Sequence, residues 1–410
     1  MMMKIRFSKT KKQLKIVIEK ICKCSFESNS LRNKNTQLNS MNDTRILNLD
    51  EKNALYKDGY VILKKVIPDK ILKEARNALS GHSSGFDKRL GYDARMTDLI
   101  NKSSLNSILS EAIGNFDPPS ACHVAVREFS EPSQQFNNVG YRDEETPYYG
   151  ASIHMDGLLS INAPQEIQHG SPQEIYNRYI ASGPKGDLGR SPEVLGHNLV
   201  PLFQDPATTL SIGSFTALVF VALSDQTKEG SGQTGVLKGA HHPMEEFFKW
   251  QKQQGSLLGP EGPGWDRLDH SVPNHCGLVY LPDAVNEQFL DDTCETTSDG
   301  RRWPKPTQIL MEPGDACISI YQLPHTGTRN EKGSESRKSV IFRIRHKKRQ
   351  PDVIVDGFTD HPDRGLMGEW LEFEPNNDPW ERSKEAICNM WDEWDGMQQV
   401  VAAKQSPNLL

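Results

Sequence analysis

The sequence predicts a mainly β protein, an antiparallel sandwich or barrel with helices packed against it. After residue 118, short stretches that alternate polar and apolar residues, or that are rich in β-branched residues, follow one another with Gly and Pro turns between them. These stretches are residues 122–129, 216–223, 277–281, 315–321 and 337–345. Short strands joined by turns form antiparallel sheets, so the fold class is mainly β with flanking helices.

The chain before these strands has a helical pattern. We expect one helix with Asp50 as its N-cap, a turn at Asp58-Gly59 and a short strand at residues 60–63. Pro68 then opens a second helix, and a third covers residues 103–113. At the carboxy-terminal end, residues 380–405 have the pattern of a helix with tryptophans on a packing face.

Composition divides the chain into three regions, and two long segments interrupt the central one. The regions are a basic extension at 1–45, a central domain at 46–350 that contains the predicted strands, and a carboxy-terminal helical extension packed on the core at 351–410. The interrupting segments, near 157–207 and 243–306, lack strand patterning, and loops of that length are often lids or binding loops.

Charge is unevenly distributed. Residues 1–40 hold ten Lys or Arg and two acids, a net charge of +8. Since the whole chain has a net charge of −6, residues 41–410 must carry −6 − 8 = −14. An acidic body argues against nucleic-acid binding. No run approaches the ~20 apolar residues of a membrane helix, so we expect a soluble protein, with a monomer favoured. Residues 1–40 are either a disordered extension of a cytoplasmic protein or an organelle transit peptide.

The cysteines do not form a recognisable framework. They are odd in number and none are paired as CxxC, which favours a reducing compartment over a disulfide scaffold or a zinc module. They are Cys22, Cys24, Cys122, Cys276, Cys294, Cys317 and Cys388.

The stretch "GASIHMDGLLS", residues 150–160, carries the first chemical signal. In a strand, His154 and Asp156 point to the same face while Met155 points away. A histidine and a carboxylate on one face are part of the two-histidine, one-carboxylate set that binds non-haem Fe(II) and leaves coordination positions open. Taken alone, the pair is better explained as a hydrogen-bonded His–Asp pair without metal.

A second histidine with suitable context lies at the end of a later strand. "MEPGDACISIYQLPHTGTRN" contains a turn, an alternating strand and then His325; Arg337 opens the next strand twelve residues on. An antiparallel return brings Arg337 back toward His325, where a guanidinium can bind a carboxylate through two parallel hydrogen bonds. Arg343 and Arg345 share the strand parity of Arg337 and are the rival candidates.

Taken in order, these segments resemble the phytanoyl-CoA dioxygenase family of Fe(II)/2-oxoglutarate oxygenases. The similar pieces are "DGYVILKKVIP", "IHMDG", "FVALSDQTKEGSGQTGVLKGAHH", "PGDACISIYQLPHTGTRN" and "RKSVIFRIR", which span roughly residues 50–350. The resemblance implies a double-stranded β-helix, or jelly-roll, core. It also implies Fe(II), 2-oxoglutarate and O2 as cofactors, with ascorbate as a candidate reductant.

Carried over by position, the resemblance assigns the site residues. His154, Asp156 and His325 become the iron ligands, and Arg337 binds the distal carboxylate of 2-oxoglutarate. Phe220 stands beside the cosubstrate. Many members carry a small hydroxyl residue two places after the distal histidine, where this chain has Gly327; Thr326 or Thr328 supplies the hydroxyl instead, or none does.

Two further residues have expected roles. His241, in the Gly-Ala-His piece, is expected to organise a turn rather than to bind metal. Because Asp156 keeps a carboxylate in the ligand set, halogenation is disfavoured.

The implied activity is oxidation of an unactivated C–H bond of a small molecule, a secondary metabolite or carboxylic acid, with release of succinate and CO2. Hydroxylation, desaturation and oxidative cyclisation stay open. The alternatives are an acyl-CoA hydroxylase of fatty-acid metabolism, a cupin-like metalloenzyme that does not use 2-oxoglutarate, and a non-catalytic jelly-roll binding protein.

Overall fold

The computed structural model describes the following residues: 45–80, 85–86, 88–120, 122–129, 153–155, 159–162, 209–212, 215–255, 258, 263–265, 281–296, 300, 302–347, 371–372 and 385–405. All of them belong to one unit, Arg45–Leu410. The expectation for residues 1–45 therefore falls outside the described residues except for its last position.

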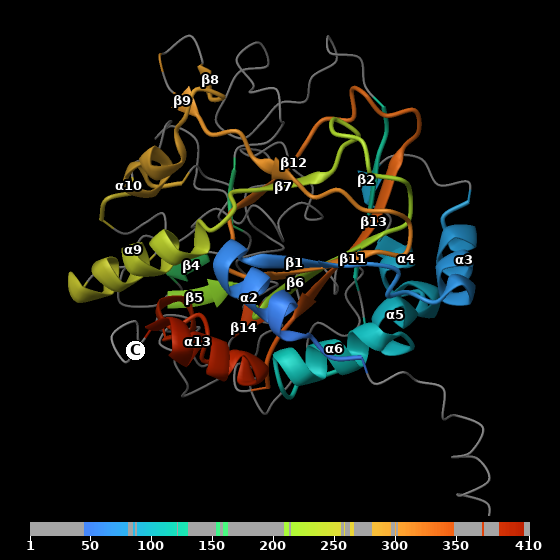
Figure 1. The fold of residues 1–410 in the computed structure, drawn as a ribbon, viewed down its shortest axis with the longest axis horizontal. Coiled ribbons are helices and arrows are strands. Elements are labelled where there is room, and N and C mark those ends of the chain that lie inside the picture. Colours follow the sequence, from blue (N-terminus) through green and yellow to red (C-terminus); the bar gives the residue numbers. More distant parts are fainter. Residues whose placement is uncertain are drawn as a thin grey trace, which may run out of the picture. The chain divides into compact units, whose positions relative to one another are not determined.

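A six-stranded antiparallel sheet forms the centre of the described fold, in the order β1-β11-β6-β13-β3-β2 (Figure 1). Its strands are β1 (Tyr60–Leu63), β2 (Gly85–Phe86), β3 (His123–Arg127), β6 (Ala217–Ala222), β11 (Ala316–Ile320) and β13 (Arg337–Ile344). Four of the five predicted strand stretches lie in this sheet, each shorter by one to three residues. The fifth, 277–281, lies outside the described residues apart from Leu281, which is not in a strand.

The two faces of this sheet differ in chemistry. Residues paired directly across an antiparallel ladder share a face, so the register divides the strands into two sets. One face is apolar apart from Lys338 at its end, and it joins the buried residues of the helices in a single hydrophobic core. The other face is mixed: Tyr60, Ile62, His123, Ala125, Arg127, Leu218, Phe220, Ala222, Cys317, Ser319, Arg337, Ser339, Ile341 and Arg343.

A second, three-stranded sheet lies over the mixed face, in the order β10-β7-β12. Its strands are β7 (Thr234–Val236), β10 (Thr307–Gln308) and β12 (His325–Gly327). The rings of Phe220 in β6 and His325 in β12 approach edge to face, with centroids 6.4 Å apart, which places β12 above the mixed face. The mainly β expectation is consistent with this arrangement, whereas the jelly-roll topology stays a prediction.

Two smaller sheets complete the strands. They are β14-β5-β4, made of β4 (Leu159–Asn162), β5 (Thr209–Ile212) and β14 (Leu371–Glu372), and the pair β8 (Glu295–Thr296) and β9 (Arg302–Trp303). The segments 157–207 and 243–306, which we expected to lack strands, therefore contain β4 and the β8–β9 pair respectively. The second segment also contains most of the helix His241–Gln253 and all of the helix Asp283–Asn286. Two-residue strands such as β8 and β9 are too short to produce a detectable alternation.

Five helices precede β3; the first, second and fifth of them were predicted, and the two between residues 88 and 101 were not. They are α2 (Leu49–Asp58), α3 (Asp69–Ala78), α4 (Lys88–Gly91), α5 (Ala94–Asn101) and α6 (Ser104–Ala112). The cap of α2 differs from the expectation: Asn48, not Asp50, accepts from the backbone N–H of Glu51, and Glu51 accepts in return from the Asn48 backbone. This capping box satisfies two donors at once, which Asp50 as a single cap could not do.

The later helices are α9 (His241–Gln253), α10 (Asp283–Asn286), η4 (Glu287–Phe289), η6 (Asp395–Met397) and α13 (Gln398–Gln405). The carboxy-terminal segment is not the single helix that we expected. Residues 385–388 are helical, turns and η6 follow, and α13 ends the described chain. The indoles of Trp391 and Trp394 are buried within the bend, so packing of these large side chains takes precedence over a continuous helix.

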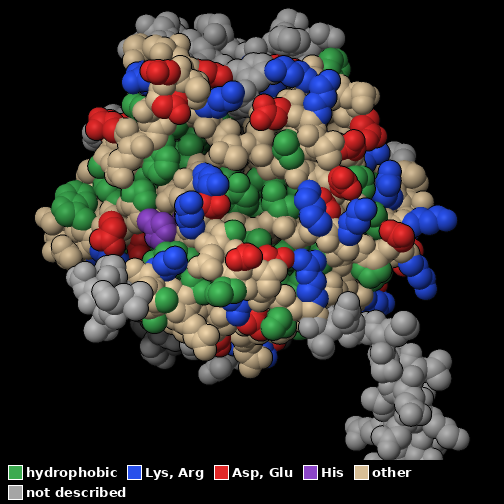
Figure 2. Space-filling model, in the orientation of Figure 1, with side chains coloured by type: hydrophobic (Ala, Val, Ile, Leu, Met, Phe, Trp, Pro, Cys, Tyr) green, Lys and Arg blue, Asp and Glu red, His purple; other side chains and the backbone are tan. Residues whose placement is uncertain are grey.

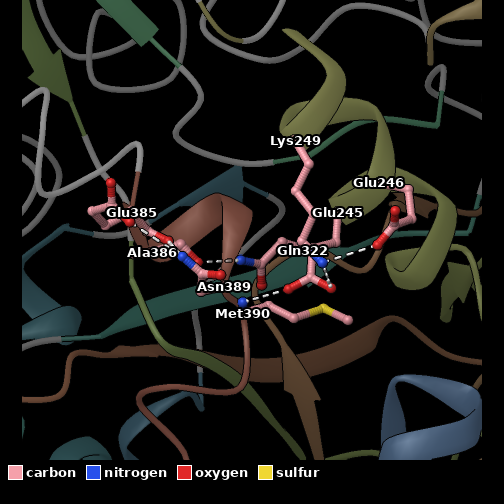
Figure 3. Close-up of polar contacts among 8 residues, drawn as sticks. All are labelled: Glu245, Glu246, Lys249, Gln322, Glu385, Ala386, Asn389 and Met390. Carbon is pink, nitrogen blue, oxygen red and sulfur yellow. Dashed lines mark hydrogen bonds and ion pairs between the residues drawn. The ribbon is translucent and has the colours of Figure 1, made fainter. Parts of the chain in front are cut away.

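Buried polar contacts join the carboxy-terminal segment to the core (Figure 3). The Glu245 carboxylate on α9 accepts from the backbone N–H of Met390 at 2.7 Å and pairs with Lys249 at 3.1 Å. From the other side, the Gln322 side chain donates to the Ala386 carbonyl at 3.1 Å. Each of these contacts uses a polar group that burial would otherwise leave unpaired.

The surface carries both signs of charge. On the face drawn in Figure 2, Lys and Arg side chains alternate with Asp and Glu, and no large field of one sign dominates the described residues there. Among the described helices, none combines the length and apolar character of a membrane span.

Candidate metal and cosubstrate site

Two of the three predicted metal ligands lie side by side. His154 and His325 form an isolated antiparallel bridge, in which each backbone N–H donates to the other residue's carbonyl at 2.9 Å. Residues paired in this way project their side chains to the same face. Accordingly, the two imidazole rings meet with centroids 4.8 Å apart and an interplanar angle of 52°.

The hydrogen bonding of His325 sets the tautomer of its ring. Its Nδ1 lies 3.1 Å from the Leu323 carbonyl, so Nδ1 carries the proton and donates. The other nitrogen, Nε2, then keeps its lone pair, and a backbone carbonyl that orients a histidine in this way is a common second partner of metal-binding imidazoles. His325 is 9% exposed, which keeps its ring in one orientation.

The third predicted ligand, Asp156, lies outside the described residues. Within the part of the chain that the structure describes, no group of three His, Cys, Asp or Glu side chains is placed to hold a metal ion. The described donor set is therefore the histidine pair. Two neutral imidazoles on one face fit a divalent first-row metal, and one carboxylate would complete the set.

Arg337 begins β13 on the mixed face and is 5% exposed. Its Nε donates to the Gly232 carbonyl at 2.7 Å, while its Nη1 is buried with no hydrogen-bond partner among the described residues. Burial, and next the charge of Arg127, lower the pKa of Arg337 to about 9. The guanidinium is still charged at neutral pH, so a buried cation here carries an unused donor suited to an anion.

Arg127 belongs to the same region and was not predicted from the sequence. It is the Cα partner of Arg337 across the β3–β13 ladder, so both side chains leave the sheet on the same face. Its Nη1 donates to the carbonyls of Thr328 at 2.8 Å and Gly327 at 3.3 Å, and burial lowers its pKa. The sequence shows an arginine at this position of the strand, but its pairing with Arg337 depends on the register, which local pattern does not give.

The remaining predicted cosubstrate residues occupy the same region. Phe220 lies on the mixed face opposite Ile341 and faces His325, so it forms a wall beside the histidine pair. Thr328 is fully buried, and its hydroxyl donates to the Gln233 carbonyl at 2.7 Å. This bond ties Thr328 to the backbone next to β7.

The rival candidates lie elsewhere. Arg343 is six residues from Arg337, about 20 Å along an extended strand, and its Nη1 donates to His123 at 2.8 Å. Arg345 follows the end of β13. His241 begins α9, and its Nε2 donates to the Tyr56 carbonyl at 2.9 Å, in keeping with a role in organising a turn.

No family model matches the chain, and no curated protein matches it. Among solved structures, apo HygX from Streptomyces hygroscopicus is 13% identical with a TM-score of 0.36, covering 73% of this chain and 87% of HygX. The epimerase SnoN in complex with Fe3+, alpha ketoglutarate and nogalamycin RO is 14% identical with a TM-score of 0.34, covering 72% of this chain and 81% of SnoN. GlcNAc Inducible Gene 2 (GIG2, DUF1479) from Candida albicans is 13% identical with a TM-score of 0.38, covering 88% of this chain and 86% of GIG2. At these identities and scores the likenesses assign no activity to this chain.

Proposed function

We propose that this chain is a non-haem Fe(II)- and 2-oxoglutarate-dependent dioxygenase with a jelly-roll core, related to the phytanoyl-CoA dioxygenase family. The observation that carries the proposal is the pairing of His154 and His325, with the His325 ring oriented by a backbone carbonyl, on the side of β12 that faces Phe220. His154, His325 and Asp156 would hold the iron. Bound iron supplies open coordination positions for a chelating 2-oxo acid and O2, and with them the oxidation of a C–H bond.

The chain's own residues position the cosubstrate. Arg337 is buried and keeps Nη1 without a described partner, so it suits the distal carboxylate of 2-oxoglutarate. Phe220 supplies an apolar wall that keeps water away from the chelating end. The substrate is a small molecule, and its oxidation takes the form of hydroxylation, desaturation or cyclisation, with succinate and CO2 released from the cosubstrate.

Anaerobic absorption spectroscopy tests the proposal. The purified full chain is titrated with Fe(II) and then with 2-oxoglutarate, and a weak visible charge-transfer band is expected on addition of the oxo acid. The His325→Ala variant should lose the band because it loses a ligand. The Arg337→Gln variant should show it only at higher 2-oxoglutarate concentrations, since the chelating end is unchanged.

Two results would contradict the proposal. Bound iron without a band at saturating 2-oxoglutarate would favour a metalloenzyme that does not use this cosubstrate. Failure of the protein to bind iron at all would make His154 and His325 a structural pair.

A further inference from the structure

Arg127 and Arg337 present two cations on one face of the sheet. They are direct partners in the β3–β13 register, where opposite side chains lie about 4.5–5.5 Å apart at Cβ. Like charges at directly opposite positions destabilise a sheet. An anion bound between the two guanidiniums would offset this repulsion.

Both guanidiniums are held in place by backbone carbonyls. Arg337 donates from Nε to Gly232, and Arg127 donates from Nη1 to Thr328 and Gly327. Gly232 contacts the stems of both side chains: a Cβ built on it would lie 3.3 Å from Arg127 Cδ and 3.5 Å from Arg337 Cβ. Oriented in this way, the two guanidiniums require little reorganisation to bind an anion.

The charges of Arg127 and Arg337 act on each other. The charge of Arg127, after burial, contributes to the lowered pKa of Arg337. A bound carboxylate would act in the opposite direction on both guanidiniums.

Gly327 leaves the space that the Arg127 guanidinium fills. A Cβ built on Gly327 would lie 2.9 Å from Arg127 Nη2 and 3.3 Å from its Cζ, closer than ordinary van der Waals contact. Gly327 stands two residues after His325 in β12, on the same face of that strand. Arg127 thus reaches from β3 to a position about 7 Å along β12 from the metal-binding histidine.

We propose that Arg127 and Arg337 together form a two-guanidinium site for the distal carboxylate of the 2-oxo acid, with Arg127 in the space that a side chain at residue 327 would occupy. This inference rests on the proposed function and adds a second residue to its cosubstrate site. Two arginines offer one carboxylate more donors than a single bidentate pair, and the carboxylate offsets the repulsion between their charges. The site accordingly selects a dicarboxylic 2-oxo acid over a monocarboxylic one.

Calorimetric titration of the full chain loaded with Ni(II), which prevents turnover, measures this selection. The ligands are 2-oxoglutarate and 2-oxobutyrate, which keeps the chelating end and lacks the distal carboxylate. For Arg127→Gln we expect the Kd of 2-oxoglutarate to rise roughly tenfold to a hundredfold, the range for a charge-assisted hydrogen bond. The Kd of 2-oxobutyrate should stay unchanged.

A rescue variant separates the anion contact from a purely structural role. Removing the guanidinium in Arg127→Ala opens the space beside residue 327, so the double variant Arg127→Ala, Gly327→Ser can place a hydroxyl there. It should recover part of the selectivity that Arg127→Ala loses. Arg127→Met keeps the length of the stem and removes the charge, so it decides the question if Arg127→Gln does not fold. Arg343→Gln, on the same face and strand but bonded to His123, is the matched control and should keep the wild-type ratio.

The outcomes are distinguishable. If Arg337→Gln loses the preference for 2-oxoglutarate and the charge-removing variant of Arg127 keeps it, the inference about Arg127 is wrong and the proposed function stands. Equal weakening of both ligands by Arg127→Gln would also overturn the inference, because it indicates a structural role. If the metal-loaded wild type does not bind 2-oxoglutarate, both proposals fail.

Discussion

Replacing Gly59 with alanine tests how the entry to the first strand supports the histidine pair. Gly59 ends α2 with φ +82°, a left-handed conformation that favours glycine. A Cβ there would lie 2.7 Å from His241 Nδ1 and 2.8 Å from Leu323 Cδ1, and both neighbours are buried. Leu323 is also the residue whose carbonyl accepts the His325 Nδ1 proton.

The expected loss has two parts. The left-handed conformation costs about 1–2 kcal/mol for a residue with a Cβ. Contacts of 2.7–2.8 Å fall at least 0.6 Å short of the 3.4 Å at which ordinary contact begins, and such overpacking of a core costs about 1–3 kcal/mol. Gly59→Ala should therefore lower the free energy of unfolding by about 2–5 kcal/mol.

Gly255→Ala is the matched control. Gly255 also follows a helix and has φ +66°, but a Cβ built on it would have nothing within 4 Å, so this variant should lose only the conformational part. Urea unfolding of both variants gives the difference directly. Metal affinity should also fall in Gly59→Ala, because displaced Leu323 releases His325, and stay unchanged in Gly255→Ala. Equal losses of stability in the two variants would refute the packing argument.

Three further predictions address neighbouring contacts. Glu245→Gln should lower the free energy of unfolding by about 1–3 kcal/mol, because a neutral amide binds the Met390 N–H less well. It should also expose the carboxy-terminal segment to limited proteolysis. In the control variant Glu246→Gln, which changes an exposed ion pair, the free energy of unfolding should change by less than about 0.5 kcal/mol. Burial lowers the pKa of His241 to about 3. The free energy of unfolding should therefore fall as pH drops from about 6.5 toward 3, by up to about 1.4 kcal/mol per pH unit. In acid unfolding curves, His241→Gln should show a weaker pH dependence. Thr328→Val should lower the free energy of unfolding by about 0.5–1.5 kcal/mol in urea without changing 2-oxoglutarate affinity, since the hydroxyl proton is already bonded to the Gln233 carbonyl. A selective loss of that affinity would instead support Thr328 as the cosubstrate contact that the resemblance implies.

Local pattern was sufficient for five of the six strands of the main sheet; the two-residue β2 was not predicted. Strands such as Ala316–Ile320 and Arg337–Ile344 are bounded by turn residues and carry β-branched side chains, so their positions follow from short-range preferences. The capping box at Asn48 and the bend near Trp391 were not predicted. A reciprocal cap and a pair of buried indoles depend on contacts that the spacing of apolar residues does not report.

For the proposed site, local pattern pointed to the residue types that such chemistry needs: a histidine followed by a carboxylate, a second histidine at a strand end and an arginine opening the next strand. Which of the described residues meet follows from the fold. The bridge between His154 and His325 joins residues far apart in sequence, and the β3–β13 register sets Arg127 opposite Arg337. Strand order and register arise from packing both faces of the sheet at once, and a single sequence contains that information only as long-range contacts that no local period reveals.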